Sequence, residues 1–372
     1  MHCVSVINIF FEMTVNSMDI LLDERHYKAS VPHEREQLGK LKSRLRDKTI
    51  ILIEGAHSPE NVIYKQDAPS TGRGILSISK SLEKMGVGFH RVTSTHKNLK
   101  DYLSIGDFAF IYAHGEYGED GRIQGWCDYL NLIYPGSGVS GSAICCDKLR
   151  FKYLISGAKI ATADFREIAE HESFGSLKEK AETLGFPVMV KDRTGGSSIG
   201  ITYISDANDL HAWHRSVSPE KLRKYFMEKF IDGKFVTVGI IKMSKGYYVL
   251  PILSAKTSAL FYDAETKMGN RQDTHSAEYD IGGGYDLAMQ TKLKSMAWEA
   301  FQSTGCEGIG RVDFIVKDGD PFILEINTIP GISNDSDFTK MFRSLGFDYD
   351  ELVLAVMNSA FLKNQSNSQE KS

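Results

Sequence analysis

The sequence predicts an α/β protein made of three consecutive blocks, and one pattern in each block carries the prediction. Residues 49–113 alternate apolar strands with a helix, which is typical of a parallel sheet covered by helices. Residues 134–204 combine helical stretches with two strands that flank a glycine-rich loop. The part from about residue 225 to residue 362 is rich in strands and contains a tight hairpin.

Length and composition are those of a globular enzyme. The chain has 372 residues, enough for two or three domains with an ample core. Hydrophobic residues make up 42% and charged residues 25%, and the formal net charge of −4 gives no basic face for nucleic acid. The five cysteines follow no zinc-binding spacing and favour a reducing, cytoplasmic compartment: Cys3, Cys127, Cys145, Cys146 and Cys306.

Both ends of the chain are predicted to lie outside the folded domains. The apolar run Val4–Phe11 is too short to cross a bilayer and lacks a basic lead, so neither an export signal nor a membrane span is expected. Residues 1–47 form an N-terminal extension, and its charge-rich part, 21–48, is predicted to be a solvated helix. The polar residues 363–372 are predicted to be a disordered tail.

The first block begins with the apolar strand Thr49–Ile53. A helix is expected from about Gly74 to Met85, and further strands near Val87–Val92 and Phe108–Ala113. Functional loops should follow the carboxyl ends of such strands. His114 stands at one of these ends; a lone histidine is usually structural, but the surrounding glycines and carboxylates favour a site.

The second block has helices at Lys148–Ser156 and around Ser176–Leu184, and then strands at Pro187–Val190 and Ile201–Ile204. The loop 191–200 joins two strands, so it is not a Walker P-loop, which leads into a helix. Its glycines and serines could surround a phosphate and close as a flap, or form a plain hairpin loop.

Charged residues at the starts and ends of these elements admit two interpretations. Lys191 ends a strand and could reach phosphate oxygens or simply lie in solvent. Asp147 could cap the following helix, which would leave Lys148 as a solvent residue. The third block is expected to open with the strand Tyr225–Phe230 and to continue through Phe235–Ile241.

A hairpin in the third block carries the most chemistry. If it turns near Gly319, Asp313 lies opposite Glu325 and Arg311 opposite Asn327, all on one face. Two carboxylates and an amide oxygen suit Mg²⁺, and the compactness of the set favours a metal site over an ordinary surface hairpin. The opposite face is predicted to enter the core with Val312, Phe314, Leu324 and Ile326.

Six motifs stand in order along the chain. They are AHGEYGEDGRIQG (113–125), YPGSGVSGSAICCDK (134–148), GFPVMVKDRTGGSSIGI (185–201), MEKFIDGKFVTV (227–238), FYDAETK (261–267) and GCEGIGRVDF with LEINTIPGIS (305–333). Together they resemble the motifs of the D-alanine–D-alanine ligases of the ATP-grasp superfamily. The resemblance spans roughly residues 48–362. It implies an ATP-grasp fold of three α/β domains, 48–134, 135–227 and 228–362, with the nucleotide between the central and C-terminal domains.

The resemblance also implies the chemistry, an ATP-dependent ligation of two amino acids through an acyl phosphate. ATP would contact Lys148, Lys191, Ser198, Glu228, Lys229, Phe230, Ile231 and Lys267. Two Mg²⁺ ions, or Mn²⁺, would be held by Asp313, Glu325 and Asn327. Arg311 and the N–H of Gly331 would form the oxyanion hole. Glu60 and Ser197 would bind the first substrate, Ser336 the second, and His114 would lie near the acceptor.

Four residues depart from the family pattern. Met268 replaces a tyrosine and cannot donate its hydrogen bond to the serine and glutamate pair. Phe235 replaces the acid that binds ribose, and Asp192 replaces a proline. Asp337 replaces an apolar residue that packs against the side chain of the acceptor, and an aspartate suits a larger, polar or cationic acceptor.

Three functions are therefore open. One is an ordinary ligase of peptidoglycan synthesis in which the departures are tolerated. Another, which Asp337 favours, is a ligase that makes a different dipeptide or depsipeptide with a polar acceptor. The third is a catalytically silent nucleotide-binding protein, which is disfavoured because the phosphate, metal and oxyanion residues are all present. The expected partners are small amino-acid substrates and, as is common among relatives, a second copy in a homodimer; neither nucleic acid nor a membrane is expected.

Overall fold

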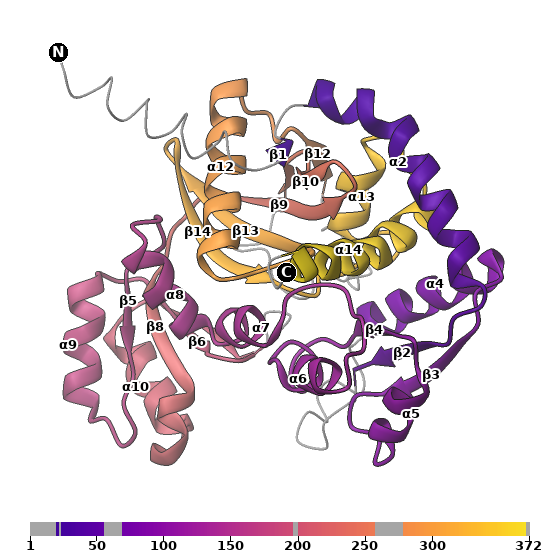
Figure 1. Ribbon diagram of the computed structural model, residues 1–372. Helices are drawn as coiled ribbons and strands as arrows, with labels where there is room; N and C mark the ends of the chain where they lie inside the picture. The colour runs from indigo at the N-terminus through magenta and orange to yellow at the C-terminus, as the bar shows by residue number, and fades with distance from the viewer. Residues whose placement is uncertain (1–19, 22–23, 56–68, 196–199, 257–277, 370–372) are drawn as a thin grey trace.

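The computed structural model describes residues 20–21, 24–55, 69–195, 200–256 and 278–369. Within these residues the chain forms three β-sheets, each covered by helices (Figure 1). The predicted mixed α/β architecture is therefore confirmed.

The N-terminal sheet is parallel, as predicted. Its order is β3 (Phe89–Thr93), β2 (Ile50–Glu54), β4 (Phe108–Tyr112). Helices α4 (Pro69–Met85) and α5 (Leu99–Ile105) make the connections between strands. Because both faces of the sheet are covered, the side chains of Ile50 through Ile53 are fully buried.

The central sheet is antiparallel and lies at the lower left of Figure 1, with the order β5 (Phe165–Glu167), β8 (Tyr225–Lys229), β6 (Val188–Asp192), β7 (Ile201–Ile204). It has its own apolar core. The sequence predicts residues 225–230 as the opening strand of the third block, but β8 pairs with β5 and β6 instead. The helices of this region are α9 (Phe174–Leu184), α10 (Ala207–Ser216) and the 3-10 helix η2 (Pro219–Lys224).

The third sheet is built around the long strand β9 (Lys234–Met243). It pairs with β13 (Ile309–Lys317) along most of its length and with β10 (Gly246–Val249) and β11 (Leu253–Lys256) toward its two ends. The outer strands are β14 (Asp320–Asn327), β12 (Glu278–Ile281) and β1 (Ile20–Leu21). The remaining helices are α2 (Glu24–Leu45), α6 (Arg122–Tyr129), α7 (Val139–Cys146), α8 (Lys148–Gly157), α12 (Leu287–Ser303), α13 (Asp337–Arg343) and α14 (Tyr349–Gln369).

The β13–β14 hairpin has the predicted register at its functional end. Its two-residue turn has positive φ at both Asp318 (51°) and Gly319 (84°), which is the type I′ geometry favoured by Asp-Gly. Beyond Asp313 a β-bulge shifts the pairing, so that Phe314 pairs with Ile323. Ile323 is therefore fully buried and Leu324 only half-buried, and the expectation that Leu324 enters the core was wrong.

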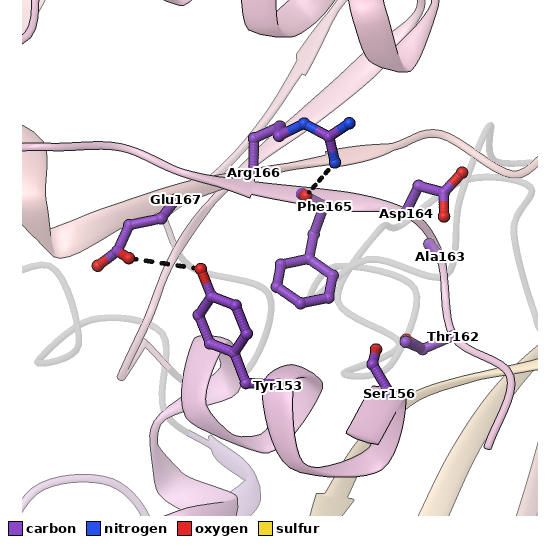
Figure 2. Close-up of a pocket in the computed structure, with 8 residues that line it drawn as sticks. All are labelled: Tyr153, Ser156, Thr162, Ala163, Asp164, Phe165, Arg166 and Glu167. Carbon is purple, nitrogen blue, oxygen red and sulfur yellow. Dashed lines mark hydrogen bonds between the residues drawn. The ribbon is translucent and has the colours of Figure 1, made fainter. Parts of the chain in front are cut away.

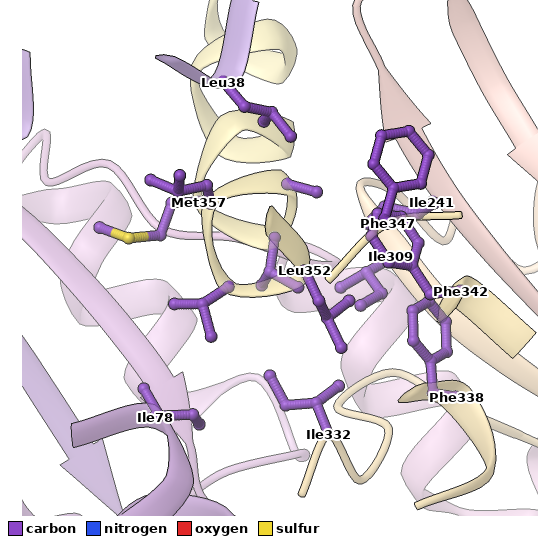
Figure 3. Close-up of a cluster of buried hydrophobic side chains, with 14 of the residues drawn as sticks. Leu38, Ile78, Ile241, Ile309, Ile332, Phe338, Phe342, Phe347, Leu352 and Met357 are labelled. Carbon is purple, nitrogen blue, oxygen red and sulfur yellow. The ribbon is translucent and has the colours of Figure 1, made fainter. Parts of the chain in front are cut away.

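Helix α2 is part of the folded core, so the expectation of a solvated extension over 21–48 was wrong. One face of the helix is buried against α4, α14 and the third sheet. Figure 3 shows Leu38 of α2, Ile78 of α4 and Met357 of α14 in one cluster with Ile241 of β9. The first and third sheets thus share one apolar core, whereas the central sheet has a separate one.

A buried carboxylate fixes α2 to the third sheet. Glu34 is fully buried and accepts hydrogen bonds from the N–H groups of Ser244 and Lys245, both at 3.1 Å, and from the hydroxyl of Tyr248 at 3.2 Å. Tyr27 stacks on Tyr248 with ring centroids 5.1 Å apart. The charge-rich sequence of this helix therefore includes a carboxylate with a specific buried role.

The C-terminal segment also differs from its prediction. Helix α14 continues to Gln369, so residues 363–369 are not the expected disordered tail. Lys363 is buried, and its ammonium donates to the carbonyl oxygen of Gly136 at 3.1 Å. Within the described residues, no helix is long and apolar enough to cross a membrane.

Candidate active site

The polar face of the β13–β14 hairpin assembles as predicted. Asp313 pairs with Glu325 and Arg311 with Asn327 across the two strands. The carboxylate of Asp313 is almost fully buried, at 1% exposure, and accepts two hydrogen bonds of 2.8 Å from Arg311. Thr237 of β9 adds a bond of 2.6 Å to one oxygen and Asn327 a bond of 3.1 Å to the other.

The charge on Arg311 is stabilised by its neighbours. Burial by itself lowers the pKa of a guanidinium, but Asp313, followed by Asp337 and Glu325, outweighs burial and raises the pKa of Arg311. Arg311 is therefore a permanent, nearly buried positive charge that faces three carboxylates. An oxyanion that forms beside it would meet a preorganised donor.

Lys148 connects the central segment with this face. Its Nζ lies 3.5 Å from Oε2 of Glu325, and it also donates to the carbonyl oxygen of Gly195. Burial by itself lowers the pKa of Lys148, but Glu325 and Glu119 raise it above its ordinary value. Asp147 caps α8, as predicted, by accepting from the N–H groups of Leu149 and Arg150.

Two residues hold the described start of the glycine-rich loop in place, at residues 192–195. Arg193 binds Asp147 with two hydrogen bonds, Nε to Oδ1 at 3.1 Å and Nη2 to Oδ2 at 2.6 Å. Asp192 accepts from the N–H groups of Thr194 and Gly195, both at 2.9 Å. Asp192 therefore organises the start of the loop, and Arg193 ties that start to the helix that carries Lys148.

Lys191 and Glu228 meet inside the central sheet. Lys191 pairs with Oε1 of Glu228, and Lys152 of α8 lies 2.8 Å from Oε2 of the same carboxylate. Burial by itself raises the pKa of a carboxyl, but the two ammonium groups outweigh it and lower the pKa of Glu228 to about 2. Glu228 is therefore an ionised carboxylate at neutral pH although it is only 2% exposed.

The segment after Glu228 leaves the central sheet for the third one. The N–H of Lys229 donates to the carbonyl oxygen of Asp164 at 2.8 Å, and that of Phe230 donates to Pro187 at 3.2 Å. Ile231 follows in the connection to β9, which begins at Lys234. The segment 228–231 therefore connects the central sheet with the third sheet.

The N-terminal sheet reaches the same region through its carboxyl edge. His114 follows β4, and its Nδ1 lies 3.8 Å from Oε1 of Glu119, whose other oxygen accepts from the N–H of Gly115 at 2.7 Å. The hydroxyl of Tyr112 accepts from the N–H of Ile332 at 3.2 Å. This bond fixes the loop that contains Gly331 next to the end of β4.

Ser336 and Asp337 start helix α13. The Ser336 hydroxyl donates to the carbonyl oxygen of Ser333 at 2.8 Å, and Cβ of Ser336 is the nearest atom to a side chain placed at Gly331. Asp337 lies 3.7 Å from Nζ of Lys340, and its charge acts on Arg311. The two residues expected at the second substrate therefore lie beside the expected oxyanion hole.

Some predicted site residues lie outside the described part of the chain, namely Glu60, Ser197, Ser198, Lys267 and Met268. The structure also places four residues in the site that the sequence patterns do not predict there, namely Lys152, Arg193, Glu119 and Thr237. The sequence contains a signal for Lys152, because this residue stands four positions after Lys148 in one helix and therefore lies on the same helix face. Thr237 had none, because its contact with Asp313 depends on the pairing of β9 with β13.

Comparisons with known proteins agree with this geometry. A family model described as the D-ala D-ala ligase C-terminus matches residues 154–358. The D-alanine–D-alanine ligase of Thermotoga sp. (strain RQ2) is 36% identical over 293 residues, which cover 77% of this chain and 91% of the relative. That of Acinetobacter baumannii (strain AYE) is 35% identical over 316 residues, covering 83% of this chain and 95% of the relative.

Solved structures give the same result. The crystal structure of the D-alanine–D-alanine ligase from Bacillus anthracis matches with a TM-score of 0.71 and 27% identity, and its complex with ATP with a TM-score of 0.70 and 26% identity. Each match covers 86% of this chain and 99% of the other. The fold is that of the ATP-grasp ligases, and the chain belongs to the D-alanine–D-alanine ligase family.

Proposed function

We propose that this protein uses ATP to join two D-alanine molecules through an acyl phosphate. The observation that carries the proposal is the meeting of Lys148 with Glu325, at 3.5 Å, above the Arg311–Asp313 pair. A cation for phosphate from helix α8 thereby meets a carboxylate for metal and a guanidinium for the oxyanion from the β13–β14 hairpin. ATP is drawn into the proposal because a structural relative was solved with it.

The proposed metal ligands are Asp313, Glu325 and Asn327, which would hold two Mg²⁺ or Mn²⁺ ions. Their hard oxygens on facing strands fit such ions. The metal would neutralise charge on the phosphoryl group during its transfer. In the described structure the oxygens of Asp313 already accept from Arg311, Thr237 and Asn327. Rotation of the Asn327 amide would free one lone pair and turn its own oxygen toward the metal.

The other residues would bind and orient the reactants. Lys148 and Lys191 would hold the phosphates together with Ser198 and Lys267, and the segment 228–231 would hold adenine. Arg311 and the N–H of Gly331 would stabilise the oxyanion of the tetrahedral intermediate. Glu60 and Ser197, beside Met268, would bind the first substrate, and His114 and Ser336 the second.

ATP turnover with Mg²⁺ and D-alanine as the only amino acid tests this proposal, with mass spectrometry of the products. We expect D-alanyl-D-alanine together with ADP and phosphate. Glu325→Gln should abolish dipeptide formation, because it removes a charge that binds metal. Release of ADP without dipeptide would contradict D-alanine as acceptor, and absence of any turnover would favour a nucleotide-binding protein without catalysis.

A second candidate is a ligase for a polar or cationic acceptor, and Asp337 favours it. Its carboxylate lies close enough to Arg311 to raise the pKa of that guanidinium. An apolar side chain at this position would instead suit the methyl group of a D-alanine acceptor. The alternative role of Asp337 is local, since acidic residues stabilise the first turn of a helix such as α13. Competition of D-alanine with lysine, ornithine and serine as acceptors distinguishes the two candidate functions. A tenfold preference for D-alanine over all of them would exclude the polar-acceptor ligase.

The proposal includes a reducing, cytoplasmic compartment and a homodimer. Among the described residues, Cys127, Cys145, Cys146 and Cys306 are free thiols. Cell fractionation and light scattering on the purified protein test these two parts separately from the chemistry.

A further inference from the structure

Lys152 is a charged side chain that the proposed chemistry does not use, and it lies inside the protein. It is 1% exposed. Its Nζ lies 2.8 Å from Oε2 of Glu228 and 2.7 Å from the hydroxyl oxygen of Thr162. Burying an ammonium group is costly unless it is paired, so a lysine in this place indicates a specific task.

Helix α8, which carries Lys152, packs against a different sheet from the one that contains Glu228. Phe151 and Ile155 of α8 lie in the same buried cluster as Val312 of β13 and Ile323 of β14, in the third sheet. Glu228, in contrast, is a residue of the central sheet. The Lys152–Glu228 ion pair therefore fixes the hinge strand of one domain to the core of the other.

A chain of hydrogen bonds extends this link toward the metal-binding strand. The hydroxyl of Thr162 donates to the carbonyl oxygen of Ile323 at 2.7 Å, two residues before Glu325. Thr162 and Ala163 also line a hollow of about 350 Å³ between α8 and β5, shown in Figure 2. Lys152 thus lies where the hinge strand β8, helix α8 and strand β14 meet.

Glu228 is shared by two lysines, and only one of them is expected to contact ATP. We propose that Lys152 is the positioning residue that keeps Glu228 ionised and in place when ATP draws the ammonium group of Lys191 toward its phosphates. The inference rests on the proposed contact between Lys191 and ATP. It assigns a task to a residue to which neither the fold nor the family comparison gives one.

The physical reason is the cost of an unpaired buried charge. The charged groups that face Glu228 in the described structure are Lys191 of β6 and Lys152 of α8, and Asp164 acts in turn on Lys152. Once Lys191 turns to the phosphates, Lys152 remains as the counter-charge. Without Lys152 the carboxylate would be left alone in an apolar interior, where glutamates take up a proton even at neutral pH.

Proton uptake on nucleotide binding gives the direct test. We would titrate the purified full chain with the β,γ-imido analogue of ATP and Mg²⁺ at pH 7, in buffers of different ionisation enthalpy. For Lys152→Met we expect the uptake of about one proton more than in the wild type, because a buried unpaired glutamate titrates above pH 7. We also expect binding to weaken about tenfold or more, because a buried carboxylate loses the partner of its ion pair.

Matched variants separate this role from a merely structural one. Lys152→Met combined with Glu228→Gln should show no extra proton, since no carboxyl remains to accept it. Lys180→Met should behave like the wild type, because Lys180 pairs with Glu172 away from the site. Equal proton uptake by Lys152→Met and the wild type would overturn the inference.

Two further variants keep the test decisive. If Lys152→Met does not fold, Thr162→Val and Thr162→Ser replace it. Serine keeps the hydroxyl that orients Lys152 and valine removes it, so only valine should weaken binding, and equal affinities would overturn the inference. Lys191→Met tests the underlying proposal by itself. Unchanged affinity of Lys191→Met for the analogue would refute the contact between Lys191 and the phosphates. If Lys191→Met loses affinity but Lys152→Met takes up no extra proton, only the role of Lys152 is refuted.

Discussion

Arg311 holds both oxygens of Asp313, with Nε 2.8 Å from Oδ1 and Nη2 2.8 Å from Oδ2. The two residues are neighbours on one face of β13, so the strand's own period brings them together. The pair places a fixed guanidinium next to the carboxylates that are proposed to bind metal.

Arg311→Lys should lower kcat about 100-fold or more, because an ammonium group cannot reproduce the planar fork that holds Asp313 and faces the oxyanion. Steady-state kinetics with D-alanine and ATP measure this. Arg343→Lys is the matched control, because Arg343 is exposed, donates its hydrogen bonds to Asn334 and otherwise lies over the ring of Tyr349 among the contacts described. An Arg311→Lys enzyme as active as the control would contradict the assigned role.

Acid should destabilise the protein through Glu228. The pKa of this carboxyl falls from an ordinary 4.5 to about 2 in the fold, so its contribution to stability is complete above pH 4.5. The contribution is lost as the pH falls toward 2, and it amounts to about 3 kcal/mol. Urea unfolding across this range should show a smaller loss for Glu228→Gln. Parallel pH profiles for the two proteins would contradict the low pKa.

Glu34→Ala should destabilise the fold by about 3 kcal/mol, because it leaves the donors of Ser244, Lys245 and Tyr248 without their acceptor. Denaturant unfolding measures the change. Glu36→Ala is the control two residues away, since Glu36 pairs with Lys40 in solvent and should have no measurable effect. Equal stability of the two variants would show that α2 does not depend on Glu34.

Ile323→Ala should cost about 2–5 kcal/mol of unfolding free energy, because it opens a cavity in a filled core. Leu324→Ala should cost clearly less, because the bulge leaves Leu324 half-buried. Thermal or urea unfolding of the two variants tests the register directly. A larger loss of unfolding free energy for Leu324→Ala than for Ile323→Ala would contradict the bulge and support the regular pairing that the sequence pattern predicts.

Local patterns in the sequence predicted much of this protein. Period-two alternation and the Asp-Gly turn placed Arg311, Asp313, Glu325 and Asn327 on one face, and the structure confirms that pairing. The same pattern failed at Leu324, because a single bulge reverses the face of the residue it leaves unpaired. Charge content failed for α2, since a helix rich in charges still buried one apolar face and Glu34.

By itself the sequence determined many of the strands and helices, their order and the residue types that the chemistry requires, because these depend on local periodicity and spacing. The tertiary structure alone decided which strands pair and which charges meet. Strand β8 joined the central sheet, and Lys152, on a helix anchored in the third sheet, became the partner of Glu228. Such contacts join residues far apart in the chain, and their energy depends on burial, which no local pattern contains.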